Sequence, residues 1–467
     1  MKKIFTPILF VAMAMMSIVA AHAVTDGQTY EAVNGIKIAN QWIFDRVHTS
    51  DAYMENPICN QRARTAVMSD GVIYVARSEA QQAIVGTDTI SQSIIYRFNA
   101  ADGSSMSPLP VTLNGRPYGA FLGVASIGRD NFGHLWVAPM TSNVQTKIPV
   151  YQLNAETGEL TLITEMDKGD APQRTDYLDV MGDITREKAE CNIMTAAGAS
   201  ADPGFPQLYR WHAEMGSDVF EGGFDGDPYV AFTIFYPETK TGFSLAPVVK
   251  MCLGSSPESM YSGELFYIDC FDTAPVLYDV SGSVVDSFEG VDSSLQPQFS
   301  ANGVTEFTIE NRNMLAYAKA AYDGNGNGCQ LNVVELGEGQ SLGGMTKYWQ
   351  LPADSLGKVS DGGLRVNCYQ VDKSEEAGSE VATLFMFKAY NGMGVYKIGK
   401  NVGGDTPTPL TGDVNKDGIV NVSDVTELIN MILGSATPDA AVGDLNGDGT
   451  INVSDVTELI NIILASA

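Results

Sequence analysis

The sequence predicts an all-β propeller, with six blades as the preferred number, followed by a small all-α module of two loop–helix repeats. Two observations support this prediction. Segments that alternate apolar and polar residues recur at intervals of about 50 to 70 residues through most of the chain. A shorter repeat with helical spacing occupies the C-terminus. We expect a signal peptide at 1–23, a propeller-like domain at 24–400, a linker at 401–411 and the helical module at 412–467.

The first 23 residues have the pattern of an export signal. Lys2 and Lys3 precede an apolar run, and Ala21-His22-Ala23 fits the small-x-small rule for cleavage. A membrane anchor fits less well because the run is short and Val24-Thr25-Asp26-Gly27 follows it directly. We therefore expect a secreted protein without a membrane anchor, extracellular or periplasmic, or held at the cell surface through a partner.

The strand repeat is clearest in one type of segment, which alternates in polarity and ends in a glycine-containing turn, as a strand entering a hairpin does. Three clear copies, one looser copy and two degraded copies occur at 95–103, 150–158, 208–216, 277–282, 331–334 and 394–398. A more apolar strand precedes most of them, at 71–76, 133–138, 265–268 and 382–387. Six such units fit the blades of a propeller, and the strand 36–44 would complete the last blade. An array of two-sheet sandwiches is the competing architecture.

Composition excludes several functions. The net charge of −28 disfavours nucleic acid and anionic membranes and favours divalent cations. The six cysteines are Cys59, Cys191, Cys252, Cys270, Cys329 and Cys368. They include no C-x-x-C pair, and few histidines are present, so a zinc site is not expected. One or two disulfides and buried free thiols both remain open.

The linker 401–411 combines flexible Gly403-Gly404 with extended Thr406-Pro407-Thr408-Pro409. After it, residues 413–424 have the spacing of a twelve-residue calcium loop. Oxygen ligands fall at positions 1, 3, 5 and 12, a backbone carbonyl falls at position 7, and glycine falls at position 6. The pattern recurs 31 residues later. We therefore expect two calcium ions, with the ligands Asp413, Asn415, Asp417, Ile419 and Asp424 in the first loop and Asp444, Asn446, Asp448, Thr450 and Asp455 in the second.

Each loop leads into a helix with one apolar stripe. The stripes are Val425, Leu428, Ile429, Ile432 and Leu433, and Val456, Leu459, Ile460, Ile463 and Leu464. Neither helix can bury its stripe alone, so we expect the two helices to pack on each other.

This duplicated loop–helix unit resembles the type I dockerin family over residues 412–467. The resemblance implies a cohesin-like scaffold protein as the partner. In that family, loop positions 10 and 11 are associated with cohesin selectivity, which points to Val422, Ser423, Val453 and Ser454. Because these pairs are the same in both repeats, a partner could bind in two orientations. The helix positions Asn430-Met431 and Asn461-Ile462 depart from the basic residues often found there. A calcium-stabilised cap that binds no partner is the alternative.

The propeller-like region resembles uncharacterised secreted propeller-like proteins. Association with a dockerin suggests that it binds glycan or protein during polysaccharide breakdown. A glycoside hydrolase or polysaccharide lyase is the alternative, and it would need two carboxylates at a cleft. The candidate carboxylates are Glu221, Asp225, Asp227, Glu258 and Glu264. Among the tryptophans, we expect Trp136 and Trp211 to lie in the core and Trp349 to be exposed. The segment 323–328 could be a third cation loop, although a hairpin turn is favoured.

Overall fold

The computed structural model describes residues 23–49, 63–77, 80–85, 88–119, 123–142, 144–168, 174–196, 207–222, 229–231, 247–269, 274–297, 303–320, 329–357, 367–376, 378–402, 412, 414–415, 420, 422–435 and 440–466. The chain divides into two compact units, Met1–Lys400 and Asn401–Ala467. The expected signal peptide, apart from Ala23, and linker residues 403–411 lie outside the described residues.

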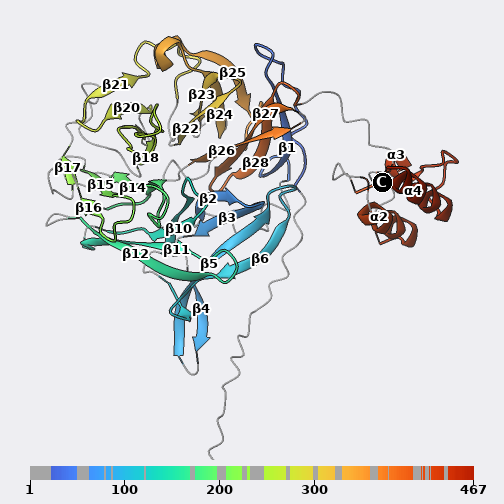
Figure 1. Ribbon diagram of the computed structural model, residues 1–467, viewed down its shortest axis with the longest axis horizontal. Helices are drawn as coiled ribbons and strands as arrows, with labels where there is room; N and C mark the ends of the chain where they lie inside the picture. Colours follow the sequence, from blue (N-terminus) through green and yellow to red (C-terminus); the bar gives the residue numbers. More distant parts are fainter. Residues whose placement is uncertain are drawn as a thin grey trace, which may run out of the picture. The chain divides into compact units, whose positions relative to one another are not determined.

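The first unit is a six-bladed β-propeller, which confirms the predicted fold and excludes the sandwich array (Figure 1). Blade 1 contains β2 (Ala63–Ser69), β3 (Val72–Arg77), β4 (Ala80–Val85), β5 (Asp88–Asn99) and β6 (Ser105–Pro110). Blade 2 contains β7 (Thr112–Leu113), β8 (Arg116–Pro117), β9 (Val124–Arg129), β10 (Leu135–Pro139), β11 (Lys147–Leu153) and β12 (Glu159–Asp167). Blade 3 contains β13 (Asp179–Gly182), β14 (Cys191–Ala196), β15 (Gln207–Ala213), β16 (Glu221–Gly222) and β17 (Tyr229–Ala231).

Blades 4 and 5 are four-stranded. Blade 4 contains β18 (Val248–Met251), β19 (Leu265–Asp269), β20 (Val276–Asp279) and β21 (Val284–Ser287). Blade 5 contains β22 (Val304–Ile309), β23 (Arg312–Ala320), β24 (Gln330–Glu335) and β25 (Thr346–Leu351), with the 3₁₀ turns η1 (Glu338–Gln340) and η2 (Leu342–Gly344) between the last two strands. Blade 6 joins the two ends of the propeller chain, in the order β1 (Lys37–Asp45), β28 (Gly392–Gly399), β27 (Ser379–Lys388) and β26 (Asn367–Glu376).

The predicted strands are the second and third strands of the blades. The apolar segments are β3, β10, β19 and β27, and the alternating segments are β5, β11, β15, β20, β24 and β28. The glycines that end the clearer copies, among them Gly103 and Gly158, have φ near +70° and +75°, as a tight hairpin turn requires.

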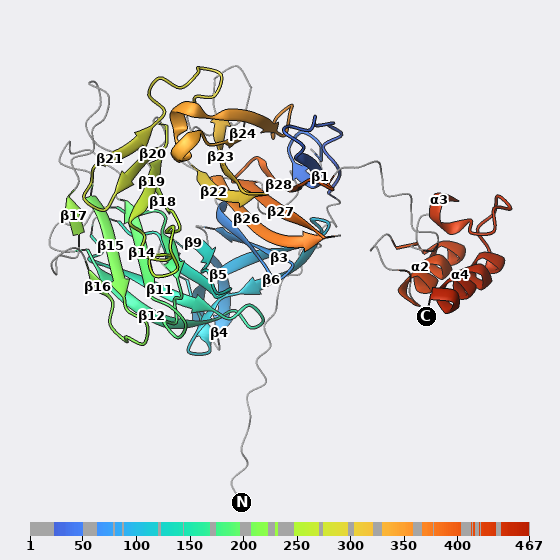
Figure 2. The same cartoon turned by 45° about the horizontal axis from the view of Figure 1, so that its top comes forward.

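Ring closure occurs as predicted for residues 36–44. Strand β1 pairs antiparallel with β28, from Lys37 opposite Gly399 to Asp45 opposite Gly392, so the two ends of the propeller chain share one sheet (Figure 2). Trp42 of β1 then packs between blades 6 and 1, and its Nε1 donates to the carbonyl of Ala100 at 2.8 Å. The N-terminal strand therefore contributes both hydrogen bonds and core packing to the closing blade.

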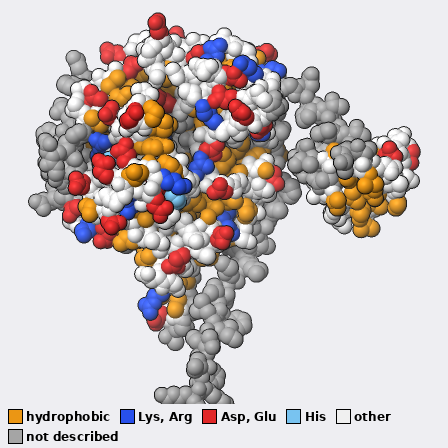
Figure 3. Space-filling view, viewed as in Figure 1, with side chains coloured by type: hydrophobic (Ala, Val, Ile, Leu, Met, Phe, Trp, Pro, Cys, Tyr) orange, Lys and Arg blue, Asp and Glu red, His pale blue; other side chains and the backbone are white. Residues whose placement is uncertain are grey.

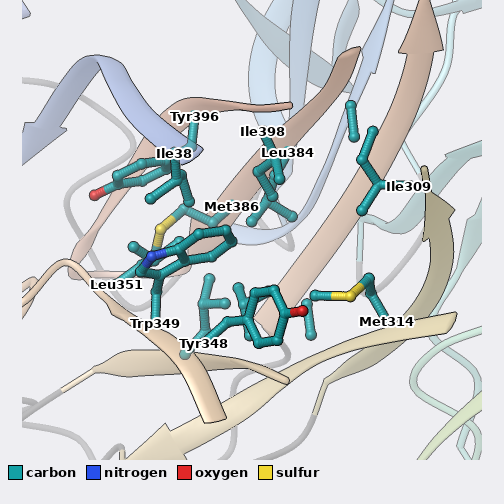
Figure 4. Close-up of a cluster of buried hydrophobic side chains, with 14 of the residues drawn as sticks. Ile38, Ile309, Met314, Tyr348, Trp349, Leu351, Leu384, Met386, Tyr396 and Ile398 are labelled. Carbon is teal, nitrogen blue, oxygen red and sulfur yellow. The ribbon is translucent and has the colours of Figure 1, made fainter. Parts of the chain in front are cut away.

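The apolar core lies between blades. One cluster combines Met314, Trp349 and Leu351 of blade 5 with Leu384 and Tyr396 of blade 6 (Figure 4). The expectation that Trp349 is exposed is wrong, because only 4% of it is accessible. Its ring fills the space between two blades, and its Nε1 donates to the carbonyl of Glu31 at 2.9 Å. Trp136 and Trp211 are buried, as predicted.

Polar side chains connect the innermost strands of neighbouring blades. Thr65 of β2 donates to the carbonyl of Ala125 and accepts from the amide of Ile127 in β9. Gln370 of β26 donates to the carbonyl of Met68 at 2.7 Å and accepts from its amide at 2.9 Å. These bonds pair buried backbone groups that face the next blade rather than a sheet partner.

The second unit contains α2 (Val422–Leu433), the four-residue α3 (Ala440–Gly443) and α4 (Val453–Ser466). Helices α2 and α4 contact each other, and Leu428 and Leu459 are fully buried between them. In the described part of the whole chain, no helix is long and apolar enough to span a membrane.

Four of the six cysteines can be placed: Cys191, Cys252 and Cys329 are buried, and Cys368 is partly buried. Cys59 and Cys270 lie outside the described residues.

Replacing Gln370 with leucine should lower the free energy of unfolding by about 2–3 kcal/mol, because both backbone groups of Met68 lose their partner in a buried position. Chemical denaturation of the full chain measures this change. Gln41→Leu is the matched control, since Gln41 is exposed and, within the described residues, its side chain bonds only to the nearby Ala39 carbonyl. Equal losses in the two variants would contradict a role for Gln370 between blades.

The turn 45–49, which follows the ring-closing strand β1, should make the protein less stable as the pH rises from about 6 to 8. Burial lowers the pKa of His48, but nearby carboxylates, chiefly Asp45 at 2.8 Å from Nδ1 and Asp354 at 3.3 Å from Nε2, together outweigh this effect, and the net pKa is raised. A raised pKa in the folded state stabilises the protein below the unfolded pKa, and this contribution is lost as the pH passes the folded pKa. The difference should be at most about 1 kcal/mol. Thermal unfolding measured across this range should show a smaller decline for His48→Gln than for the native chain, and equal declines would contradict the assignment.

Candidate metal and docking site

The second predicted calcium loop, 444–455, is described completely and folds around its own acidic side chains. Asp444 accepts from the amide of Asp448 through Oδ1 at 3.0 Å and from the amide of Gly449 through Oδ2 at 2.8 Å. Gly447 and Gly449 have φ of +72° and +85°, which allows the chain to turn sharply at these positions. The short polar residues therefore bend the backbone so that several oxygens lie inside one turn.

The middle of the loop continues this pattern. Oδ1 of Asn446 accepts from the amide of Asp448 at 2.8 Å. Oδ1 of Asp448 accepts from the amide of Thr450 at 2.9 Å and from its hydroxyl at 2.6 Å. These hydrogen bonds lower the pKa of Asp448, so its carboxylate is ionised at neutral pH.

Asp455 connects the loop to helix α4. Its side chain is fully buried in the first turn of the helix. Oδ1 accepts from the amides of Leu445 and Asn446 at 2.9 and 3.1 Å, and Oδ2 accepts from the amide of Asn452 at 2.8 Å. The helix N-terminus also favours this negative charge.

The first loop is described only in part. Asp424 is fully buried in the first turn of α2, like Asp455, and accepts from the amide of Asn415 at 3.0 Å. The predicted ligands Asp413, Asp417 and Ile419 lie outside the described residues. All five predicted ligands fall among the described residues in the second loop only.

The donor set fits calcium. The second loop offers two carboxylates and an amide oxygen at positions 1, 3 and 5, a carbonyl at Thr450 and a buried carboxylate at Asp455. These are the hard oxygen donors that Ca²⁺ prefers. The same residues already hold the loop backbone, so ion binding and loop folding depend on the same side chains.

Two other groups of potential metal ligands lie in the propeller, and each gathers its ligand atoms within 4.8 Å. In the first, Asp130 and Asp183 flank His134. Their oxygens accept from several backbone amides, including those of Phe132, Ile184 and Lys188. The hydrogen bonds of this group therefore connect blade 2 to blade 3. The second group, Glu190, His212 and Glu214, is more exposed, and Glu214 lies largely in solvent.

The two helices pack on each other as predicted, and Leu428 and Leu459 of the predicted stripes are buried, but other apolar residues of the two helices remain exposed. Val422 and Val453 are 71% and 70% exposed, and Leu433 and Leu464 are 72% and 70% exposed. Ile429 and Ile460 are also exposed. Each exposed residue has a counterpart 31 residues away, so the two helices present equivalent rows. Figure 3 shows apolar side chains gathered in one area of the module. We call Val422, Ile429, Leu433 and Val453, Ile460, Leu464 the paired stripes. Ser423 and Ser454 are exposed beside their N-terminal ends.

Three of the five candidate carboxylates in the propeller can be placed. Glu221, Glu258 and Glu264 are exposed, while Asp225, Asp227 and segment 323–328 lie outside the described residues. The sequence interpretation overlooked Glu306 of the inner strand β22, which accepts from the Tyr267 hydroxyl at 2.6 Å. Burial raises the pKa of Glu306. It was overlooked because only the second and third strands of the blades repeat recognisably.

Comparisons with known proteins gave a family match for the second unit and matches to solved structures for the chain. Residues 411–464 match the Dockerin type I domain family. No curated protein matches the chain. A solved DUF4623 family protein from Bacteroides eggerthii is 12% identical, covers 80% of this chain and 77% of its own, and has a TM-score of 0.52. Saccharomyces cerevisiae Sqt1 is 7% identical, with 72% and 95% coverage and a TM-score of 0.36. AofleA from Arthrobotrys oligospora is 10% identical, with 80% and 88% coverage and a TM-score of 0.41.

These matches establish a type I dockerin at the C-terminus, and its family indicates a cohesin as partner. The likeness to the DUF4623 family protein supports the propeller fold alone.

Calcium should be required for the module to fold. We expect circular dichroism of residues 401–467 to show helix on calcium addition and loss of that helix with a chelator, because the loop carboxylates repel one another without the ion. Asp455→Ala and Asp424→Ala should each weaken one site in calorimetric titration. Glu458→Ala, which removes an exposed carboxylate outside the loops, should leave both sites nearly unchanged. Full helicity in excess chelator would contradict this prediction.

Proposed function

We propose that this protein is exported and that its dockerin attaches it, in a calcium-dependent manner, to a cohesin-like scaffold protein. The attached propeller then binds glycan or protein during polysaccharide breakdown. The observation that supports docking is the pair of exposed apolar stripes, because six large apolar side chains in solvent on a small module are typical of an interaction surface.

Calcium supports docking by fixing the start of each helix. Val422-Ser423 and Val453-Ser454 are loop positions 10 and 11 and also the first residues of α2 and α4. Asp424 and Asp455, the proposed twelfth ligands, immediately follow them and are buried. An ion bound at either loop would therefore hold the adjacent valine and serine in position for a partner.

The binding role of the propeller rests on its closed six-bladed ring and on its association with a dockerin. A glycan array on the full chain tests this role directly, and the absence of any bound glycan would leave a protein ligand as the remaining form of the proposal.

The alternative function is a glycoside hydrolase or polysaccharide lyase on the propeller. The half-buried Glu306 favours this alternative because burial raises its pKa, which is the direction that a general acid requires. A screen for polysaccharide cleavage would test it, with Glu306→Gln as the inactive variant. If the native chain cleaves no polysaccharide, or if Glu306→Gln cleaves as fast as the native chain, this assignment of Glu306 fails.

The two repeats should be interchangeable in docking. Replacing Ser423 alone with aspartate should change affinity for the partner by less than about threefold, because the module can rotate and present Ser454. Replacing both serines should weaken binding by about 100-fold, since each orientation then places a charge in the interface. Calorimetry with the captured partner measures both effects. If the single substitution weakened binding as much as the double one, docking would stand, but binding in two orientations would be excluded.

A further inference from the structure

The turns at one end of blade 5 form an open cleft of about 440 Å³. One wall comes from Asn311 in the β22–β23 turn and from Arg312 and Asn313 at the start of β23. The other comes from the end of β24 and the turn η1, with Glu335–Gln340. This volume is within the range of small-ligand sites and is sufficient for one or two sugar units.

The cleft is lined almost entirely by polar groups. Leu336 is the one apolar side chain among its lining residues, and it is buried. The side-chain amides of Asn311, Asn313 and Gln340 are exposed, and they make no hydrogen bond within the described part of the chain. Each amide can both donate and accept, which suits a ligand with many hydroxyl groups.

The charged part of the cleft is fixed in place. Nη1 of Arg312 donates to both carboxylate oxygens of Glu335, at 2.8 and 3.0 Å. The Tyr348 hydroxyl donates to Glu335 at 2.5 Å and accepts from Nδ2 of Asn34 at 2.9 Å. A side chain from the N-terminal segment therefore helps to hold the floor of the cleft before any ligand binds, which lowers the entropy cost of binding.

The backbone of the cleft also adopts an uncommon conformation. Asn311 and Gln340 have φ of +61° and +64°, a region that residues other than glycine rarely occupy. At Asn311 it is the conformation that the two-residue hairpin turn between Ile309 and Arg312 requires. Two of the three unpaired amides are therefore presented from left-handed positions on opposite walls.

We infer that this cleft binds one or two units of a neutral saccharide. Its polar lining disfavours apolar and aromatic ligands, and Glu335 and Glu338 outnumber the single guanidinium of Arg312, which disfavours anions. This inference rests on the proposed glycan-binding role and assigns that role to particular residues.

Saturation-transfer NMR on the calcium-loaded full chain provides the test. The probes are glucose, galactose, mannose, xylose, cellobiose and maltose, with glucuronate and galacturonate as acidic counterparts. At least one neutral sugar should bind, and its acidic counterpart should bind more weakly. The double variant Asn311→Gly, Asn313→Ala should weaken binding at least tenfold, because two amides that contact hydroxyls are lost.

Asn114→Gly is the matched control. Asn114 also has a positive φ, of +52°, and is exposed, but it lies in the β7–β8 turn outside the cleft. The Asn114→Gly variant should bind the sugar with the same affinity as the native chain. An unchanged thermal midpoint in the double variant will show that the propeller remains folded.

Three results would overturn the inference. Equal binding by the native chain and the folded double variant would exclude the cleft while leaving the proposed glycan-binding role intact. Stronger binding of the acidic sugars would exclude the neutral ligand class. Absence of binding to every sugar would remove both the cleft assignment and the proposal that the propeller binds these glycans.

Discussion

The propeller depends on the burial of blade faces by neighbouring blades. A single blade has apolar side chains on both faces, so it is stable only when another blade covers each face. The last blade can meet the first only if the ring closes, and the pairing of β1 with β28 closes it. Trp42 then fills the space between blades 6 and 1, and the side chains of Thr65 and Gln370 pair backbone groups near the centre of the ring.

This constraint explains how far the sequence could predict the fold. The second and third strands lie inside each sheet, so their apolar pattern is strong, and the glycine turns that follow β5 and β11 mark their ends. The first and fourth strands are harder to recognise. Thr65 and Gln370 contact the next blade instead of solvent, and these contacts depend on residues distant in the sequence. Trp349 was predicted to be exposed for the same reason, since the blade 6 side chains that cover it come from distant parts of the chain.

The dockerin shows a similar division between local and distant information. The loop geometry of Asp444 and Asp448 could be predicted because it depends on neighbours within five residues. The exposure of Leu433 and Leu464 could not, since helical spacing indicates that a face is apolar but does not show how much of it a small partner helix can cover. The repeat makes the two uncovered areas equivalent, which connects the module's symmetry to its proposed docking role.

The measurement that tests this account most directly is a pull-down from the native secretome with two forms of the protein, the full chain and a chain ending at Lys400, each in calcium and in chelator. We predict that mass spectrometry will identify a protein containing a cohesin domain only with the full chain in calcium. Capture of that protein by the shortened chain, or by the full chain in chelator, would contradict the account, as would the absence of any such protein when calcium is present.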